Sequence, residues 1–183
     1  MFCYPAADNC VCVIVDMQQK LLPAMSDPAG VLDRTMMLVK GMKELQVPLL
    51  VTEQYPQGLG NTVAELADLF DDSDRIIAKT SFSCFGKEQF TGALDIESRP
   101  VMIIAGIESH VCVAQTALDA VNSGYRVFIA ADAVCSRKPS DRETALAQLR
   151  HAGCTIASSE AILFMLLRSA RHPSFKVISK LVR

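Results

Sequence analysis

The sequence lacks any hydrophobic run long enough to cross a bilayer, and its longest apolar stretches, such as Val101–Ala105, have the length of buried strands. It also lacks an excess of charge, because 18 Lys and Arg oppose 20 Asp and Glu for a net charge of −2. No overall field therefore draws the chain to phosphate or anionic lipid, and no stripe of Lys and Arg with interleaved aromatics is present. We expect no membrane span and no nucleic-acid partner.

Histidine is scarce and cysteine lacks paired spacing. The three histidines, His110, His151 and His172, are scattered without the spacing of metal ligands. The seven cysteines are odd in number and contain no C-x-x-C pair, which argues against a disulfide framework and a zinc ribbon. We therefore expect no structural or catalytic metal and no cofactor. A single buried cysteine is by default a small packed hydrophobe.

The first ten residues, Met1–Cys10, contain no Lys or Arg and so lack the cationic start of a secretory signal. A predicted strand follows almost at once, at Val11. We infer a cytoplasmic protein. The length of 183 residues suits one domain, residues 1–183, with room for a substantial core.

Short apolar runs alternate with segments of helical character along the whole chain. Because the runs are continuously apolar, they predict strands covered on both faces, as in a parallel sheet. Strand–helix alternation predicts right-handed crossovers and a three-layer α/β/α, Rossmann-like domain with six parallel strands. The predicted strands are Val11–Val15, Pro48–Thr52, Arg75–Ala78, Val101–Ala105, Arg126–Ala130 and Thr155–Ala157, and the predicted helices are Val31–Leu45, Cys112–Asn122, Ser140–His151 and Ser159–Ala170.

Two segments rich in turn formers, Glu53–Asn61 and Thr80–Lys87, follow the second and third predicted strands. Open α/β sheets bind ligands at the carboxyl edge of their strands, where these segments fall. Three reactive side chains are predicted at the same edge: Asp16 after the first strand, Lys79 after the third and Cys112 after the fourth. Each alone is explained as a turn residue, a solvated cation or a packed thiol. Together they supply a base, a cation and a nucleophile.

The chemistry that this set predicts is acyl transfer through Cys112. A thiol with a pKa near ~8.5 is mostly protonated at neutral pH, and a helix N-terminus and the Lys79 ammonium both favour its thiolate. Asp16 is expected to take the thiol proton and later to activate water, although its charge opposes the thiolate. Backbone N–H groups of the turn Glu108–Cys112 are expected to stabilise the oxyanion. The product is a thioester that water cleaves.

Several segments carry a family resemblance that covers nearly the whole chain. The three signature segments of the isochorismatase-like hydrolases resemble V-I-V-D-M-Q, A-K-T and G-I-E-S-H-V-C-V, at Val13–Gln18, Ala78–Thr80 and Gly106–Val113. Two further segments, Thr52–Gly60 and His172–Leu181, look like the eukaryotic isochorismatase-domain-containing members.

The resemblance implies the strand order 3-2-1-4-5-6 and a homo-oligomer. It matches Asp16, Lys79 and Cys112 to the catalytic Asp, Lys and Cys of the family. It also implies a non-proline cis peptide between Ile107 and Glu108, which directs the Glu108 N–H to the oxyanion position beside that of Cys112.

The sequence departs from two branches of the family. Metal-binding nicotinamidases carry histidines in the loop after the second strand, whereas this loop reads Glu53-Gln54-Tyr55-Pro56. Close relatives of isochorismatase itself, which cleaves a vinyl ether, lack the nucleophilic cysteine that this chain has. The departures favour a carbon–nitrogen bond or another acyl group in a small molecule as the target.

A substrate pocket is predicted from residues that neighbour these segments, although core or interface packing explains the apolar ones equally well. His110 is given at most a substrate-facing role. The candidate pocket residues are Leu22, Gln54, Tyr55, Phe82, Phe85 and His110. The alternative to a hydrolase is a catalytically silent family member that acts as a protein-interaction module, since fold does not imply function. The intact Asp, Lys and Cys set favours the enzyme.

Overall fold

The computed structural model describes residues 4–183, so Cys3 lies outside the described part. Six strands form one sheet, and every pair of neighbouring strands is parallel. The order is β3-β2-β1-β4-β5-β6, which confirms the predicted fold class and topology. The strands are β1 (Cys10–Val15), β2 (Leu49–Gln54), β3 (Arg75–Lys79), β4 (Val101–Ile107), β5 (Arg126–Cys135) and β6 (Thr155–Ala157).

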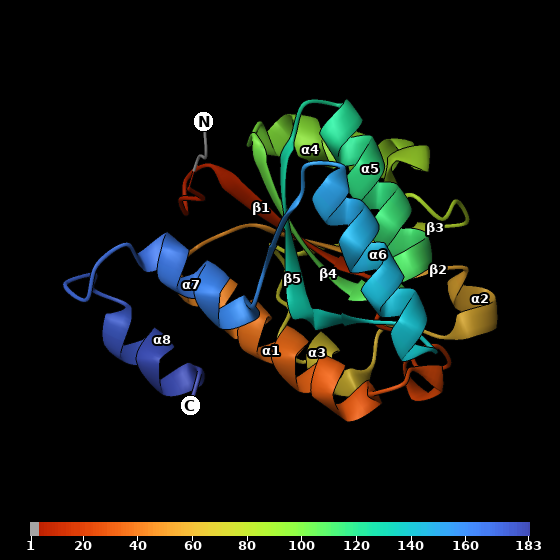
Figure 1. Cartoon of the computed structure of the whole chain (residues 1–183), viewed down its shortest axis with the longest axis horizontal. Coiled ribbons are helices and arrows are strands. Elements are labelled where there is room, and N and C mark those ends of the chain that lie inside the picture. The colour runs from red at the N-terminus through yellow and green to blue at the C-terminus, as the bar shows by residue number, and fades with distance from the viewer. Residues whose placement is uncertain (1–3) are drawn as a thin grey trace.

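Helices cover both faces of the sheet, with α1, α7 and α8 on one face and α4, α5 and α6 on the other (Figure 1). Two short helices, α2 and α3, lie in the connection between β2 and β3. The helix bounds are α1 (Pro28–Glu44), α2 (Pro56–Leu59), α3 (Ala64–Ala67), α4 (Glu88–Glu97), α5 (Ala114–Asn122), α6 (Pro139–His151), α7 (Ser159–Leu167) and α8 (Phe175–Leu181).

Strand β1 shows why its sequence is continuously apolar. All six of its residues are fully buried. Cys10, Cys12 and Ile14 point into the hydrophobic core beneath α1 and α7. The alternate residues Val11, Val13 and Val15 point into a second core beneath α4 and α5, as the two-residue period of a strand requires. Strand β1 is therefore buried on both faces, as predicted, whereas the edge strand β3 leaves Ile76 51% exposed.

The predicted elements differ from the observed ones mainly at their ends. Strand β2 continues through Gln54, so Glu53 belongs to the strand, where its Oε1 accepts from Thr62 N and Oγ1 at 2.7 and 2.9 Å. Helix α1 begins at Pro28, because the Asp27 side chain caps it by accepting from Gly30 N at 3.0 Å. Helix α4 was not predicted, and the predicted helix Ser159–Ala170 ends at Leu167.

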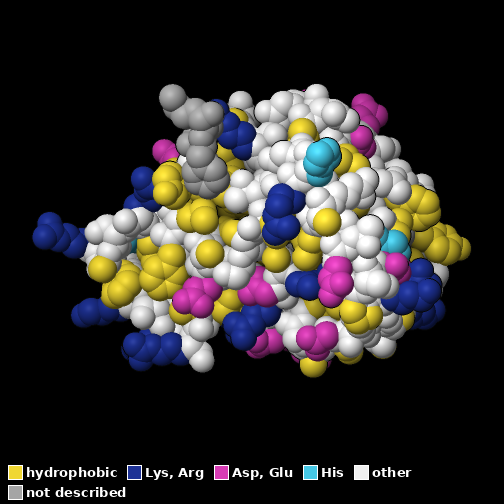
Figure 2. Space-filling model, in the orientation of Figure 1, with side chains coloured by type: hydrophobic (Ala, Val, Ile, Leu, Met, Phe, Trp, Pro, Cys, Tyr) yellow, Lys and Arg dark blue, Asp and Glu magenta, His cyan; other side chains and the backbone are white. Residues whose placement is uncertain are grey.

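Among residues 4–183, no helix is both long and apolar enough to cross a membrane. On the face shown in Figure 2, Lys and Arg side chains lie among acidic, hydrophobic and uncharged ones, and several gather at the end formed by α7 and α8. The basic residues of this C-terminal segment are all exposed, as expected of a solvated face: Arg168, Arg171, Lys176, Lys180 and Arg183.

Candidate active site

Asp16 follows β1 directly and is fully buried. Its φ of 52° lies in the left-handed region, which Asp tolerates better than most residues. Strand β2 holds it twice, because Asp16 N donates to Thr52 O at 3.1 Å and Asp16 Oδ1 accepts from Thr52 Oγ1 at 2.7 Å. The carboxylate is therefore fixed at the carboxyl edge of the sheet.

Lys79 ends β3, and its side chain is closed off from solvent. Its Nζ lies 2.8 Å from Asp16 Oδ2 and 2.8 Å from Gln54 Oε1. The carbonyl oxygens of Ser81 and Phe82 each lie 3.2 Å from the same nitrogen. An ammonium has three protons, so these four acceptors saturate it. Lys79 thus ties β1, β2 and the segment after β3 together.

Cys112 lies in a π-helical turn, Ser109–Val113, which follows β4 and precedes α5. The predicted helix start at Cys112 is wrong, because α5 begins two residues later, at Ala114. The peptide bond between Ile107 and Glu108 is cis. The Cys112 thiol lies close enough to the Asp16 carboxylate and the Lys79 ammonium for both charges to act on its pKa. The structure therefore brings Asp16, Lys79 and Cys112 together.

The charge balance at Cys112 differs from the expected one. Burial raises the pKa of the Cys112 thiol above its ordinary value, and the Asp16 carboxylate raises that pKa further. The Lys79 ammonium lowers the pKa but does not offset the other two effects. Lys79 thus acts in the expected direction, but the expectation that it offsets Asp16 is wrong for the site without substrate. The thiol therefore keeps its proton at neutral pH.

Gly106 allows the nucleophile turn to approach β1 closely. Its φ is 116°, and a Cβ atom at this position would lie 2.0 Å from the carbonyl oxygen of Val15. The pairing of β4 with β5 also shifts register between Ile104 and Gly106. Only glycine combines this positive φ with so close an approach to Val15. Gly106 therefore fixes the direction in which the turn with Cys112 leaves the sheet.

Glu108 and His110 direct their side chains toward the segment after β5. Glu108 Oε2 accepts from Arg137 N and Arg137 Nε at 3.1 and 3.0 Å. His110 Nδ1 lies 3.0 Å from Ser136 Oγ, and its Nε2 lies 3.8 Å from Asp141 Oδ2. These contacts fasten both ends of the turn 108–110 to the β5–α6 connection.

One polar side chain in this turn has no partner. Ser109 is buried, and within residues 4–183 its Oγ is the one buried side-chain nitrogen or oxygen without a hydrogen-bond partner. An unpaired buried hydroxyl costs about 1–3 kcal/mol. Ser109 lies next to the predicted oxyanion position. The turn that contains the predicted nucleophile therefore also contains a polar group that the fold leaves without a partner.

The predicted pocket residues divide into two sets. Gln54 contacts Lys79 directly, and Phe82 contacts it through its carbonyl oxygen. Tyr55 and Phe82 are 53% and 54% exposed, so their rings are free to meet a ligand. Leu22 is instead buried in the core beneath α1. Phe85 packs edge-on against Phe90 and Tyr125, with ring centroids 5.5 and 6.1 Å away.

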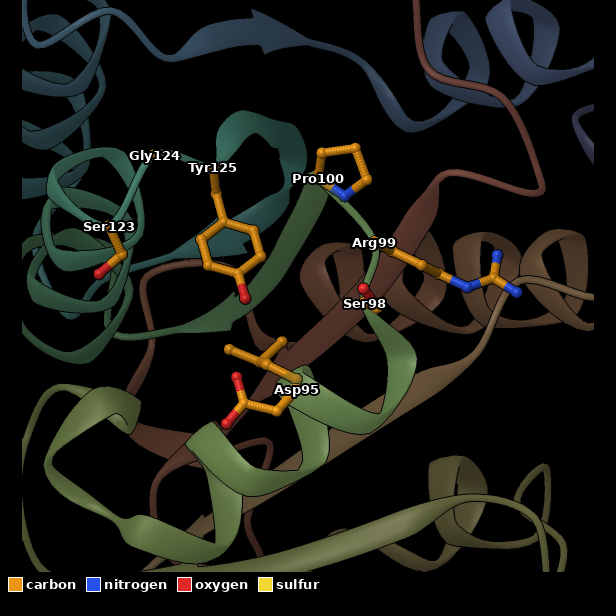
Figure 3. A pocket seen from close by; sticks show the side chains of 8 residues that line it. Asp95, Ser98, Arg99, Pro100, Ser123, Gly124 and Tyr125 are labelled. Atoms are coloured by element: carbon orange, nitrogen blue, oxygen red, sulfur yellow. The ribbon is translucent and has the colours of Figure 1, made fainter.

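Two cavities lie at opposite edges of the sheet. A cavity of about 230 Å³ at the carboxyl edge is lined by Tyr55, Lys79 and Ser81, among others. A cavity of about 370 Å³ is lined by the residues that precede β4 and β5, including Pro100 and Tyr125, and so lies at the amino edge (Figure 3). No group of three His, Cys, Asp or Glu side chains within residues 4–183 is arranged to hold a metal ion.

Sequence reasoning missed two neighbours of the site, Thr52 and Cys84. Thr52 holds Asp16, and Cys84 Sγ lies 3.8 Å from Thr52 Oγ1. Burial raises the pKa of Cys84 to about 11. Thr52 falls at the end of a predicted strand, like Asp16 and Lys79, so the same edge argument identifies it once Thr hydroxyls are included.

The Isochorismatase domain profile matches residues 10–161. The chain belongs to the isochorismatase family. It is 37% identical to zebrafish isochorismatase domain-containing protein 2, over 94% of this chain and 86% of that protein. It is also 37% identical to zebrafish isochorismatase domain-containing protein 1, over 92% of this chain but only 59% of the length of that relative.

Solved structures of the isochorismatase fold superpose closely on this chain. The MAR1 ribonuclease of Caenorhabditis elegans gives a TM-score of 0.94 at 33% identity, over 98% of this chain and 92% of that one. YcaC of Pseudomonas aeruginosa, solved with hexane-2,5-diol and covalent acrylamide, gives 0.93 at 25% identity, over 99% and 92%. YcaC of Escherichia coli, described as an octameric hydrolase of unknown specificity, also gives 0.93 at 25% identity, over 99% and 90%.

Proposed function

We propose that this chain is a cysteine hydrolase that cleaves a small amide or a related acyl substrate through a thioester on Cys112. The observation that carries the proposal is the meeting of the Cys112 turn with the buried Asp16–Lys79 pair, in which Lys79 Nζ lies 2.8 Å from Asp16 Oδ2 and both charges act on the Cys112 thiol. A nucleophile, its base and a group that orients the base are the parts of an activated nucleophile site.

The first half of the reaction forms the thioester. Cys112 Sγ attacks the substrate carbonyl carbon while its proton moves to Asp16. The carbonyl oxygen becomes an oxyanion, which the backbone N–H groups of Glu108 and Cys112 stabilise. When the carbon–nitrogen bond breaks, Asp16 returns the proton to the leaving nitrogen. The acyl group is then bound to sulfur, and the amine leaves.

The second half releases the acid. Asp16 takes a proton from a water molecule, whose oxygen attacks the thioester carbon. The same oxyanion donors stabilise the second tetrahedral intermediate. The carbon–sulfur bond breaks, Cys112 regains its proton and the carboxylic acid product departs.

In this proposal Lys79 acts through Asp16. Its ammonium has no spare proton for a substrate, because Asp16, Gln54, Ser81 and Phe82 occupy it. The raised pKa of Cys112 keeps the thiol protonated until a substrate arrives, so Asp16 has to accept that proton during attack. Covalent acrylamide in the related YcaC structure supports a reactive nucleophile on this fold, because acrylamide is an electrophile.

The test also distinguishes two alternative functions, a catalytically silent interaction module and an enzyme that acts on RNA. A silent interaction module has the same fold without turnover. Action on RNA is raised by the name of the C. elegans relative, but the net charge of −2 gives no attraction to a polyanion. We further propose a homo-oligomer in the cytoplasm.

A library of small amides, carbamoyl compounds and esters tests the proposal. Wild-type protein and Cys112→Ala are incubated with each compound, and products are identified by mass spectrometry. We expect a carboxylic acid product from wild type only, with the mass of an acyl adduct on wild-type protein. Cys135→Ala is the matched control, because this buried thiol lies at the end of β5 and contacts Ser26 instead. Equal turnover by Cys112→Ala contradicts the proposal, and RNA cleavage by wild type alone replaces the substrate class.

A further inference from the structure

Thr52 is a fully buried residue of β2, between the strands that carry Asp16 and Lys79. Its Oγ1 lies 2.7 Å from Asp16 Oδ1. Cys84 Sγ approaches the same hydroxyl, at 3.8 Å. A hydroxyl has one proton and a carboxylate only accepts, so Thr52 donates to Asp16 and accepts from Cys84. The chain of donors therefore runs from Cys84 through Thr52 to Asp16.

The two oxygens of Asp16 have different partners. Oδ2 lies 2.8 Å from Lys79 Nζ, whereas Oδ1 is bound by the Thr52 hydroxyl. An ammonium on a flexible stem holds one oxygen and leaves the carboxylate free to turn about its own axis. A donor on the other oxygen fixes the plane of the group. Thr52 also accepts from Asp16 N at 3.1 Å, so the residue is anchored by backbone and side chain.

The position of Thr52 is itself well determined. In the parallel ladder it lies opposite Val15 of β1 and Ile77 of β3, so the sheet fixes its backbone on both sides. Its branched side chain has restricted rotamers in a strand. Cys84, whose backbone N donates to Thr116 Oγ1 at 3.0 Å, holds the far side of the hydroxyl. The hydroxyl is thus aimed at Asp16 before any substrate binds.

We propose that Thr52 is a positioning residue of the proposed hydrolase, which orients the Asp16 carboxylate toward the Cys112 thiol and neutralises part of its charge. The inference rests on the proposed role of Asp16 as the base. Thr52 touches neither the thiol nor a substrate, and it acts through Asp16. The same hydrogen bond weakens the repulsion between the carboxylate and a thiolate on Cys112, because donation to an anion reduces the charge that its neighbours feel.

The test measures the rate at which iodoacetamide alkylates Cys112 between about pH 7 and 9, read by peptide mass spectrometry, because this rate reports the thiolate. The charged and titratable groups around Cys112 are Asp16, Lys79 and Cys84, and Thr52→Val leaves all three in place. We expect Thr52→Val to displace the rate–pH curve upward by about 0.5–1 pH unit, which is a roughly three- to tenfold slower reaction at a fixed pH.

Two further variants separate positioning from folding. Thr52→Ser keeps the hydroxyl and is expected to restore the wild-type curve. Thr35→Val makes the same change at a buried threonine of α1, whose hydroxyl donates to Val31 O at 2.7 Å, and is expected to leave the curve in place. If Thr52→Val does not fold, Thr52→Ala replaces it with the same expected displacement, since alanine introduces no new atoms.

The outcomes distinguish this inference from the function on which it rests. If Cys112 in wild type reacts no faster than Cys135, the proposed function fails. If wild-type Cys112 reacts selectively but Thr52→Val and Thr52→Ala follow the wild-type curve, the role of Thr52 is refuted and the nucleophile assignment stands. A displacement shared equally by Thr35→Val, or one that Thr52→Ser does not reverse, also overturns the inference.

Discussion

Lys79 Nζ and Asp16 Oδ2 lie 2.8 Å apart with both side chains closed off from solvent, although the two residues are 63 positions apart and their strands are separated by β2. Strand β2 bridges them, because Thr52 holds one oxygen of Asp16 and Gln54 accepts from Lys79. The ion pair therefore depends on three strands ending at the same edge, and it couples the proposed chemistry to the stability of the sheet.

Removing one partner of this pair leaves an uncompensated buried charge. We expect Lys79→Met to lower the free energy of unfolding by about 3–5 kcal/mol, as for other buried ion pairs that lose one member. The double variant Lys79→Met with Asp16→Asn is expected to recover part of the loss, since no charge then remains. Urea denaturation followed by circular dichroism measures both. A loss below about 1 kcal/mol in the single variant contradicts the closed pair.

Because β4 lies so close to β1 at Gly106, we expect alanine substitutions at Gly106 and Gly92 to change the stability of the protein in opposite directions. Gly106→Ala places a Cβ atom 2.0 Å from Val15 O in a backbone with a φ of 116°, so we expect a loss of about 3 kcal/mol or more, or no folded protein. Gly92→Ala in α4 meets open space and is expected to add roughly 0.5–1 kcal/mol. Thermal unfolding of both variants checks this, and similar stabilities for the two contradict it.

The buried thiol of Cys84 predicts a loss of stability in alkali. Its pKa rises from 9.0 to about 11 on folding because burial disfavours the thiolate. A folded-state pKa above the unfolded one gives stability that is complete below about pH 9 and disappears as the pH rises through about 11. A rise of this size corresponds to roughly 2–3 kcal/mol.

Denaturation midpoints measured between pH 7 and 11 test the contribution of Cys84. We expect Cys84→Ala to be less stable than wild type at pH 7 and to lose less stability on alkalinisation. Other buried thiols contribute to the same decline, so Cys154→Ala serves as a second variant, since burial also raises the pKa of Cys154 to about 11. Identical pH dependence in wild type and Cys84→Ala is the outcome that rules out the assignment.

A homo-oligomer, dimer or larger, stays a prediction for this chain. Exposed hydrophobic side chains such as Ile76, Phe82 and Phe164 give apolar surface that association would cover. The related YcaC of Escherichia coli is described as octameric. Light scattering at micromolar concentration is expected to give at least twice the mass of one chain, and a mass equal to one chain refutes the prediction.

The sequence predicted the sheet and much of the candidate site for one physical reason. Strands buried on both faces read as continuous apolar runs, and the carboxyl ends of parallel strands meet at one edge. Asp16 and Lys79 each follow such a run, so their meeting could be inferred. Thr52 was missed because a threonine at the end of a β-branched run reads as a strand former.

Features decided by tertiary contacts were not accessible to the same reasoning. The directions of Glu108 and His110 depend on Arg137 and Ser136, which follow a different strand. The raised pKa of Cys112 depends on how deeply the turn is buried, and spacing along the chain carries no information on depth. From the sequence, Leu22 and Phe85 could belong either to a pocket or to the core. Their packing in the structure shows that they belong to the core.

The nucleophile assignment is tested most directly by the rate at which each cysteine of the native protein reacts with iodoacetamide across pH 7 to 9, normalised to the unfolded chain. We expect Cys112 to react faster than Cys84 and Cys135, because the residue is 7% exposed whereas Cys84 and Cys135 are 0% and 3% exposed. Since its pKa lies above this range, its rate is expected to rise about tenfold per pH unit. Reaction of Cys112 no faster than Cys84 and Cys135 throughout would contradict the account.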